Sequence, residues 1–181
     1  FDWFSVEAQA GQAGHVLKSI RSWRGEEARD GGKKLRVVYF HPKDREPIKN
    51  HRKRWDGIMS DMRDFYRVEM KRLGYGKVDL GLEQENGMLK LHEVRGAGKD
   101  DGSYAYGSGG KIKGEVFKAL KAKGINPQEE TILIVCGLSR TEGRKVTIYS
   151  PYYGMGGNHN WGLCFTADME WLSIDGLRPD P

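Results

Sequence analysis

The chain has 181 residues, of which 38% are hydrophobic and 30% charged, with a formal net charge of +5 at pH 7. This length suits one compact domain, and the moderate charge lacks the clustered basic stripe of a dedicated nucleic-acid-binding protein. No run of about 18 apolar residues occurs, so the sequence predicts no membrane-spanning helix.

Residues 1–32 are predicted to form a helical extension ahead of a single α/β domain that covers residues 33–181. Apolar residues recur three and four positions apart within residues 7–23 and just before them, which predicts a short amphipathic helix. These residues are Val6, Ala10, Ala13, Leu17 and Ile20.

The first strand and the longest helix are predicted next. Residues 33–40 are rich in β-branched and aromatic side chains and end at His41-Pro42, which favours a strand. Residues 52–73 show the clearest helical periodicity, so we expect an amphipathic helix with its apolar stripe in the core. The stripe consists of Trp55, Ile58, Met59, Met62, Phe65, Tyr66, Met70 and Leu73.

A hairpin and a long loop follow. Residues 78–81 and 88–94 flank Asn86-Gly87, and Asn-Gly between two strand-like segments is a strong hairpin signal. Residues 96–110 contain six glycines and are predicted to form a surface loop.

The second half of the chain adds a helix at 111–123, a fully covered central strand at 130–138 and a half-covered strand near a sheet edge at 144–149. Cys136 lies in the apolar run of the central strand and is interpreted as a core thiol, with a Cys136–Cys164 disulfide as the alternative. The predicted fold is α/β: a mixed, twisted sheet of about five strands backed by two main helices.

The histidines do not supply a catalytic zinc motif. A zinc-binding helix presents two histidines on one face as His-Glu-x-x-His, and His92-Glu93 is followed by Val-Arg-Gly instead. We therefore assign no metal ligand within this chain. A divalent-metal nuclease is one alternative, because Asp79 and Glu93 fall on the two strands of the predicted hairpin. Arg95 then stands where such sites place a lysine.

Three segments together resemble a group of large secreted bacterial proteins. They are Val-Tyr-Phe-His-Pro-Lys-Asp-Arg-Glu-Pro at 38–47, Asp-Phe-Tyr-Arg-Val-Glu-Met-Lys-Arg-Leu-Gly-Tyr-Gly at 64–76, and Leu-His-Glu-Val-Arg-Gly at 91–96. In those proteins the same order of segments leads into a zinc peptidase motif of the zincin type. The resemblance implies a zincin-like N-terminal subdomain of a secreted or cell-surface bacterial metallopeptidase. Its zinc-binding helix, with histidine ligands and a glutamate general base, would follow Pro181.

The same resemblance implies a peptide or protein substrate that pairs with an edge strand of the sheet. Residues 149–161 would form the substrate rim, because they follow the predicted edge strand and are rich in aromatic residues and glycine. The candidate contacts are Tyr149, Tyr152, Tyr153, His159 and Trp161. The other alternative is a non-catalytic module that binds a glycan or a protein through the loops at 96–110 and 149–161.

Overall fold

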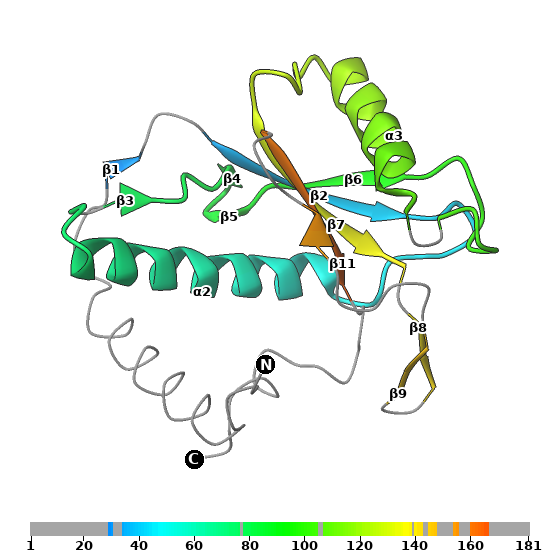
Figure 1. Ribbon diagram of the computed structural model, residues 1–181, viewed down its shortest axis with the longest axis horizontal. Coiled ribbons are helices and arrows are strands. Elements are labelled where there is room, and N and C mark those ends of the chain that lie inside the picture. Colours follow the sequence, from blue (N-terminus) through cyan, green and yellow to red (C-terminus); the bar gives the residue numbers. More distant parts are fainter. Residues whose placement is uncertain are drawn as a thin grey trace.

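The computed structural model describes residues 29–30, 34–76, 78–104, 107–138, 140–142, 145–147, 154–155 and 160–166. Its centre is a five-stranded sheet with the strand order β10-β11-β7-β2-β6 (Figure 1). These strands are β10 (Gly154–Met155), β11 (Trp161–Thr166), β7 (Thr131–Gly137), β2 (Leu35–His41) and β6 (Leu91–Arg95). Four strands run parallel, and β10 is antiparallel to β11, which confirms the predicted mixed α/β sheet.

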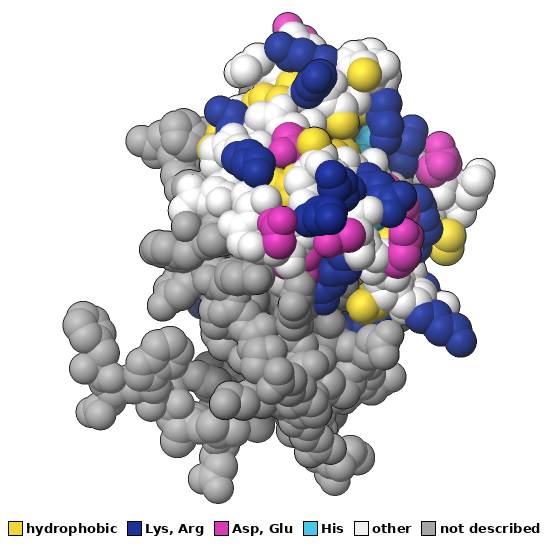
Figure 2. Space-filling view, turned by 90° about the vertical axis from the view of Figure 1, so that its right-hand side faces the viewer, with side chains coloured by type: hydrophobic (Ala, Val, Ile, Leu, Met, Phe, Trp, Pro, Cys, Tyr) yellow, Lys and Arg dark blue, Asp and Glu magenta, His cyan; other side chains and the backbone are white. Residues whose placement is uncertain are grey.

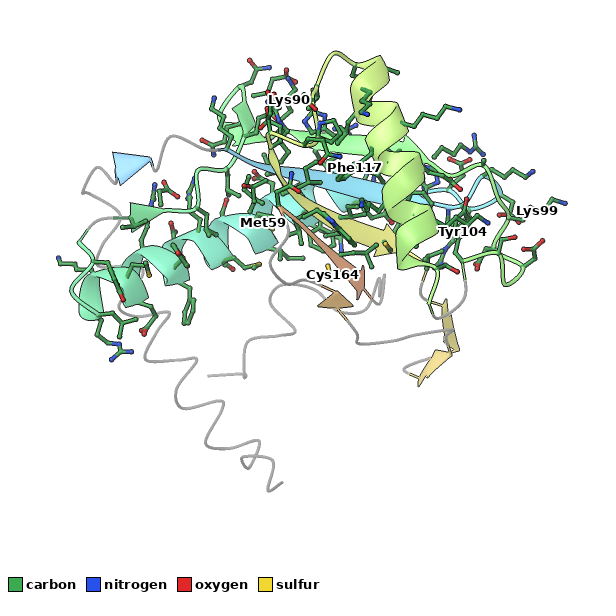
Figure 3. All side chains as sticks on the ribbon, turned by 45° about the horizontal axis from the view of Figure 1, so that its top comes forward. Met59, Lys90, Lys99, Tyr104, Phe117 and Cys164 are labelled. Carbon is green, nitrogen blue, oxygen red and sulfur yellow. The ribbon has the colours of Figure 1, made fainter. Side chains whose placement is uncertain are left out.

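Helices α2 (His51–Arg72) and α3 (Gly109–Ala122) cover opposite faces of this sheet. Successive side chains of a strand point to opposite faces, and β2 divides its apolar residues accordingly. Val37 and Tyr39 pack with Met59 of α2, whereas Val38 and Phe40 pack in the cluster that contains the apolar residues of α3. Figure 3 shows Met59 and Phe117 on the two sides of the sheet. The prediction of two main helices backing the sheet is therefore confirmed.

Strand β7 occupies the centre of the sheet, as its continuous apolar sequence predicted. Cys136 of β7 is fully buried among the residues that face α3, while Cys164 of β11 packs against the cluster that faces α2. Both thiols are free, and their positions on opposite faces exclude a disulfide between them. Burial raises the pKa of Cys136 well above its ordinary value and that of Cys164 to about 11.

The apolar stripe of α2 is only partly buried, so its predicted placement in the core is wrong at three positions. Met59 is fully buried, but Met62, Phe65 and Leu73 are 48%, 47% and 56% exposed. At about 1.5 Å per residue a helix of this length spans roughly 33 Å, whereas a seven-residue strand spans only about 23 Å. The helix therefore extends beyond the sheet toward β3 (Figure 1).

The hairpin at Asn86-Gly87 is present but shorter than predicted. It joins β4 (Gln84–Glu85) to β5 (Met88–Leu89), and both turn residues have positive φ angles, 53° and 78°. A two-residue turn of this kind pairs the residues that directly flank it. The predicted partner segments instead lie elsewhere: β3 (Val78–Asp79) pairs with β1 (Arg29–Asp30), and residues 91–95 form β6 beside β2.

Replacing Gly87 with alanine is expected to lower the free energy of unfolding by about 1 kcal/mol, because a left-handed backbone conformation crowds a Cβ atom. Gly114 is the matched control, since it lies inside α3 without a positive φ and has open space around it. Gly114→Ala should raise stability by roughly 0.5–1 kcal/mol. Urea denaturation of both variants checks the pair, and equal effects of the two substitutions would contradict the turn assignment.

The predicted edge strand at 144–149 does not join the main sheet within the described residues. Lys145–Thr147 forms β9, which pairs with β8 (Arg140–Glu142) in a separate two-stranded sheet. The edge of the main sheet on this side is instead formed by β10, which lies beside β11, a strand that was not predicted.

The predicted helix at 7–23 lies outside the described residues. Neither α2 nor α3, the helices in the described part of the chain, is long and apolar enough to cross a lipid bilayer.

Candidate functional site

The predicted substrate rim, residues 149–161, contains the outer strand of the main sheet. Within it, Gly154–Met155 forms β10, which pairs on one side with β11 and ends the strand order of the sheet. Tyr149, Tyr152, Tyr153 and His159 lie outside the described residues. The structure therefore places an antiparallel edge strand in the predicted rim, while the roles of these four side chains stay predictions.

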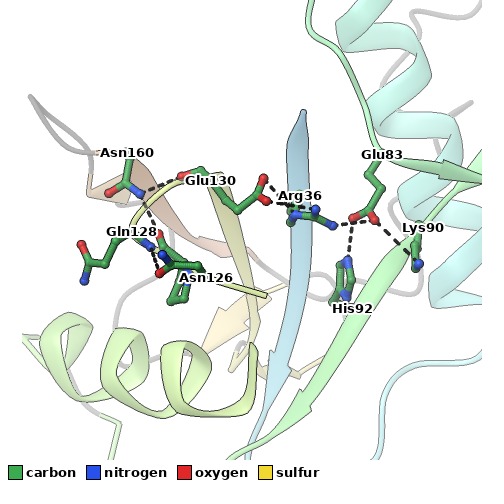
Figure 4. Close-up of polar contacts among 9 residues, drawn as sticks. Arg36, Glu83, Lys90, His92, Asn126, Gln128, Glu130 and Asn160 are labelled. Atoms are coloured by element: carbon green, nitrogen blue, oxygen red, sulfur yellow. Dashed lines mark hydrogen bonds and ion pairs between the residues drawn. The ribbon is translucent and has the colours of Figure 1, made fainter. Parts of the chain in front are cut away.

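Trp161 and Asn160 fix the end of the rim to the body of the domain. Trp161 opens β11 opposite Ile132 and packs against the apolar cluster that faces α3. The Nζ atom of Lys113 lies 5.2 Å from the centroid of its ring, within cation–π range. The side-chain amide of Asn160 donates to the carbonyl oxygens of Pro127 and Glu130, each at 2.7 Å (Figure 4). Trp161 is thus a partly buried anchor beside the rim.

The loop that begins at Gly96 is held by a buried tyrosine. Tyr104 is 2% exposed, accepts a hydrogen bond from the Gly98 amide at 2.7 Å and donates one to Glu115 at 3.0 Å. Burial, together with the nearby carboxylate, raises the pKa of the Tyr104 hydroxyl to about 12. The described part of this predicted surface loop therefore has an internal anchor, which the glycine-rich sequence did not indicate.

The two carboxylates of the nuclease hypothesis lie in different sheets. Asp79 forms an ion pair with Arg67 near the end of α2, whereas Glu93 contacts His51 at its start. At about 1.5 Å per residue, these two helix positions are roughly 24 Å apart along the axis. Arg95 instead contacts Glu46 and the carbonyl oxygen of Lys43. The short hairpin at Asn86-Gly87 contains neither Asp79 nor Glu93, so the structure does not bring the residues of the nuclease hypothesis together.

A polar cleft of about 590 Å³ lies beside β6. Four basic side chains line it, together with acidic residues, a histidine and a few apolar groups. The basic residues are Arg36, Arg52, Lys90 and Lys123. Charges of both signs also lie side by side on the face that Figure 2 shows, which is the right-hand side of Figure 1. The cleft was not predicted, although its sequence signal is the charged pair His92-Glu93 between the apolar residues of a strand.

Glu83 is the centre of a buried charge network in this cleft (Figure 4). Its carboxylate lies 2.5 Å from Arg36 Nη1 and 2.7 Å from His92 Nε2, and it is 9% exposed. Arg36 also contacts Glu130 at 3.0 Å. Burial by itself would raise the pKa of Glu83, but the hydrogen bonds from His92 and Arg36 lower it overall. The network ties together the starting ends of β2, β6 and β7.

A second charge cluster joins β6 to the first turn of α2. Glu93 lies 2.7 Å from His51 Nε2 and 2.6 Å from Arg52 Nη2. Burial opposes ionisation of Glu93, but the hydrogen bond from His51 and the charge of Arg52 lower its pKa overall. This cluster ties the start of α2 to the edge strand β6.

The described residues do not fit a zinc site. No group of three or more histidine, cysteine, aspartate or glutamate side chains in this part of the chain is arranged to hold a metal ion. Glu83 and Glu93 are instead each paired with an arginine and a histidine.

Three crystal structures of OgpA from Akkermansia muciniphila are similar to this chain. The catalytically inactive form in complex with an O-glycopeptide substrate, glycodrosocin, is 25% identical, with a TM-score of 0.60 over 72% of this chain and 38% of OgpA. A wild-type crystal form is 26% identical, with a TM-score of 0.61 and coverages of 76% and 40%. A second wild-type form is 25% identical, with a TM-score of 0.64 and coverages of 84% and 43%.

No model of a known protein family matches the chain, and no curated protein matches it. The chain spans less than half of the OgpA chains to which it is similar. It therefore shares its α/β fold with part of an enzyme that has an O-glycopeptide substrate.

Proposed function

We propose that this chain is part of a zinc-dependent peptidase of the zincin type that cleaves peptides or proteins carrying O-linked glycans. The similarity to OgpA over 84% of this chain, at 25% identity, is the observation that supports the proposal. The resemblance of the segments at 38–47, 64–76 and 91–96 to secreted zincin-type proteins points to the same class. A secreted or cell-surface location in a bacterium is part of the proposal.

The antiparallel edge strand β10 is the proposed place for the substrate. An extended peptide can add to an exposed sheet edge through main-chain hydrogen bonds, while pockets on either side select its side chains. β10 is paired only on its β11 side within the strand order of the described sheet. Tyr149, Tyr152, Tyr153, His159 and Trp161 are then proposed to contact the peptide or its glycan.

The proposed zinc ion needs protein ligands that the described residues do not supply. The 181 residues contain no His-Glu-x-x-His, and the described residues do not assemble a metal site. We therefore assign the zinc-binding helix and its general base to residues outside this chain. The part described here contributes the sheet and its substrate edge.

The test uses the natural protein that contains these residues and two synthetic peptides of the same sequence, one with an O-linked glycan and one without. We expect mass spectrometry to show cleavage of the glycosylated peptide, loss of cleavage after a zinc chelator and recovery when zinc is restored. Equal cleavage of both peptides would remove the glycan requirement.

An intact glycopeptide after incubation with the zinc-loaded protein would overturn the proposal. If that protein still bound the glycopeptide, the non-catalytic binding module would replace the peptidase. Binding is measured by isothermal titration with the same two peptides, so one set of reagents separates the two functions.

A further inference from the structure

Helix α2 carries a stripe of side chains on its exposed side. Its members recur four, three and four positions apart, so they share one face of the helix. They are Ile58, Met62, Phe65 and Glu69. Met62 and Phe65 are 48% and 47% exposed, and Glu69 forms a surface ion pair with Arg72 at 2.8 Å. A largely apolar stripe with this spacing is the kind of surface that a second helix covers.

The predicted helix at 7–23, which lies outside the described residues, has a stripe with the same spacing. Ala13, Leu17 and Ile20 belong to it, and the next position in the series is Arg24. Two parallel helices with matching stripes pack with these positions in register. The resulting pairs are Ala13 with Ile58, Leu17 with Met62, Ile20 with Phe65, and Arg24 with Glu69. Apolar side chains thus meet apolar ones, and the arginine meets the glutamate.

The path of the chain supports this parallel arrangement. β1 begins at Arg29, five residues after Arg24, and pairs in parallel with β3, where Val78 is the partner of Arg29. β3 in turn packs on α2, and Arg67 of the helix forms an ion pair with Asp79 (Figure 1). The predicted helix and α2 therefore lead into two neighbouring strands that run in the same direction. A linker of five residues spans at most about 17 Å, which keeps the end of the predicted helix close to the second half of α2.

We propose that residues 7–24 form a helix that docks on α2, parallel to it, with the two stripes in register. Burial of the half-exposed Met62 and Phe65 side chains favours docking, and the pair of Arg24 with Glu69 sets the register. The occupant is this segment rather than a second copy or a separate protein, because the short linker gives it a high effective concentration beside the stripe. Undocking leaves the sheet intact, so substitutions in the stripe weaken docking rather than the whole domain.

The test joins the two stripes by a disulfide in the full chain, and it does not depend on whether the chain belongs to a peptidase. One variant carries Ile20→Cys and Phe65→Cys, at positions that meet in the proposed register. The matched control carries Ala10→Cys and Phe65→Cys, which displaces the first thiol by ten residues, or about 15 Å along a helix. Burial raises the pKa of both native thiols, Cys136 and Cys164, so they react slowly. Both variants are equilibrated in a glutathione redox buffer, and mass spectrometry of tryptic peptides measures the crosslinked fraction.

We expect the disulfide between positions 20 and 65 to form within one chain, with an effective thiol concentration about ten-fold or more above that of the control. Arg24→Glu in the same background should lower this concentration about three-fold, because it places two acidic side chains opposite each other. Lys18→Glu is the matched charge reversal, since Lys18 lies next to the stripe in the sequence but not on it. It should change the effective concentration by less than about 1.5-fold.

Hydrogen exchange of the chain without added cysteines gives a second measurement. The amides of residues 13–20 should exchange about ten-fold more slowly in the wild type than in Phe65→Asp, which places a charge in the docked stripe. Lys53→Asp is the control, because Lys53 is an exposed residue of the first turn of α2 outside the stripe. Equal exchange in the wild type and in Phe65→Asp would overturn the proposal.

The crosslinking experiment has three further outcomes that contradict docking in this register. Equal effective concentrations in the two cysteine variants would mean that the segment has no fixed position along α2. A disulfide that formed mainly between two chains, seen as a dimer on a non-reducing gel, would assign the stripe to a second copy. Crosslinking no greater than in urea would leave the stripe to a different protein or segment.

Discussion

Replacing Phe40 with alanine should lower the free energy of unfolding by about 4 kcal/mol, the largest effect that we expect from a single substitution. Its side chain is fully buried in the cluster that faces α3 and meets the Tyr104 ring edge-on, with centroids 5.1 Å apart. Gly96 packs so closely on both rings that an added Cβ would lie 2.6 Å from Phe40 Cζ. Loss of the ring therefore opens a cavity between the sheet, α3 and the loop that Tyr104 anchors.

Phe65→Ala is the matched control, because it removes the same side chain from the exposed part of α2. We expect a loss below about 1 kcal/mol there, since a half-exposed ring leaves little cavity. Guanidinium denaturation followed by circular dichroism measures both variants. A loss at Phe65 equal to that at Phe40 would contradict the orientation of α2 described here.

The elements with strong periodicity were predictable from the sequence. β2, α2, α3 and β7 agree with their predicted segments to within two residues at each end, because their apolar spacing matches the period of a strand or a helix. The extent of burial was not predictable in the same way. Phe65 has the spacing of a core residue, but α2 is longer than the sheet that it covers.

The edge of the sheet was the part of the fold that the pattern misplaced. Residues 144–149 alternate as an edge strand should, yet Lys145–Thr147 pairs locally with β8. The strand that joins the sheet, β11, begins at Trp161 directly after a glycine-rich segment that favoured a loop. Strand partners are chosen by contacts distant in sequence, which a local pattern does not contain.

The polar cleft was not predictable from the sequence either, because its charged residues pair across elements that are distant in the sequence. Glu83 lies just before the hairpin in a segment without a clear periodic signal, and its partners Arg36 and His92 come from two different strands of the main sheet. The parallel register of β2 and β6 brings Arg36 and His92 close, and backbone hydrogen bonds of Gly81 and Glu83 to Leu35 place Glu83 beside them. The charged residues within apolar strands were a signal for such a network, but their partners were not visible in the sequence.

Replacing Glu83 with glutamine should lower the free energy of unfolding by about 2 kcal/mol at neutral pH. The substitution keeps the size of the side chain but removes the negative charge between Arg36 and His92, both of which are largely buried. Glu130 still pairs with Arg36, so the loss stays below that of a fully isolated buried charge. Glu85→Gln is the control, because its side chain is 62% exposed and its ion pair with Lys90, at 3.5 Å, lies at the surface.

The lowered pKa of Glu83 determines how the stability difference changes with pH. The pKa of Glu83 in the folded protein lies below its ordinary value of 4.5, so the folded state favours the ionised carboxylate. The resulting stability is complete above about pH 4.5 and is lost as the pH falls through the folded pKa. The stability difference between the wild type and Glu83→Gln should therefore narrow as the pH falls below about 4.5. Denaturation series at several pH values measure it, and a difference that widened in acid would show that Glu83 is not held ionised by its partners.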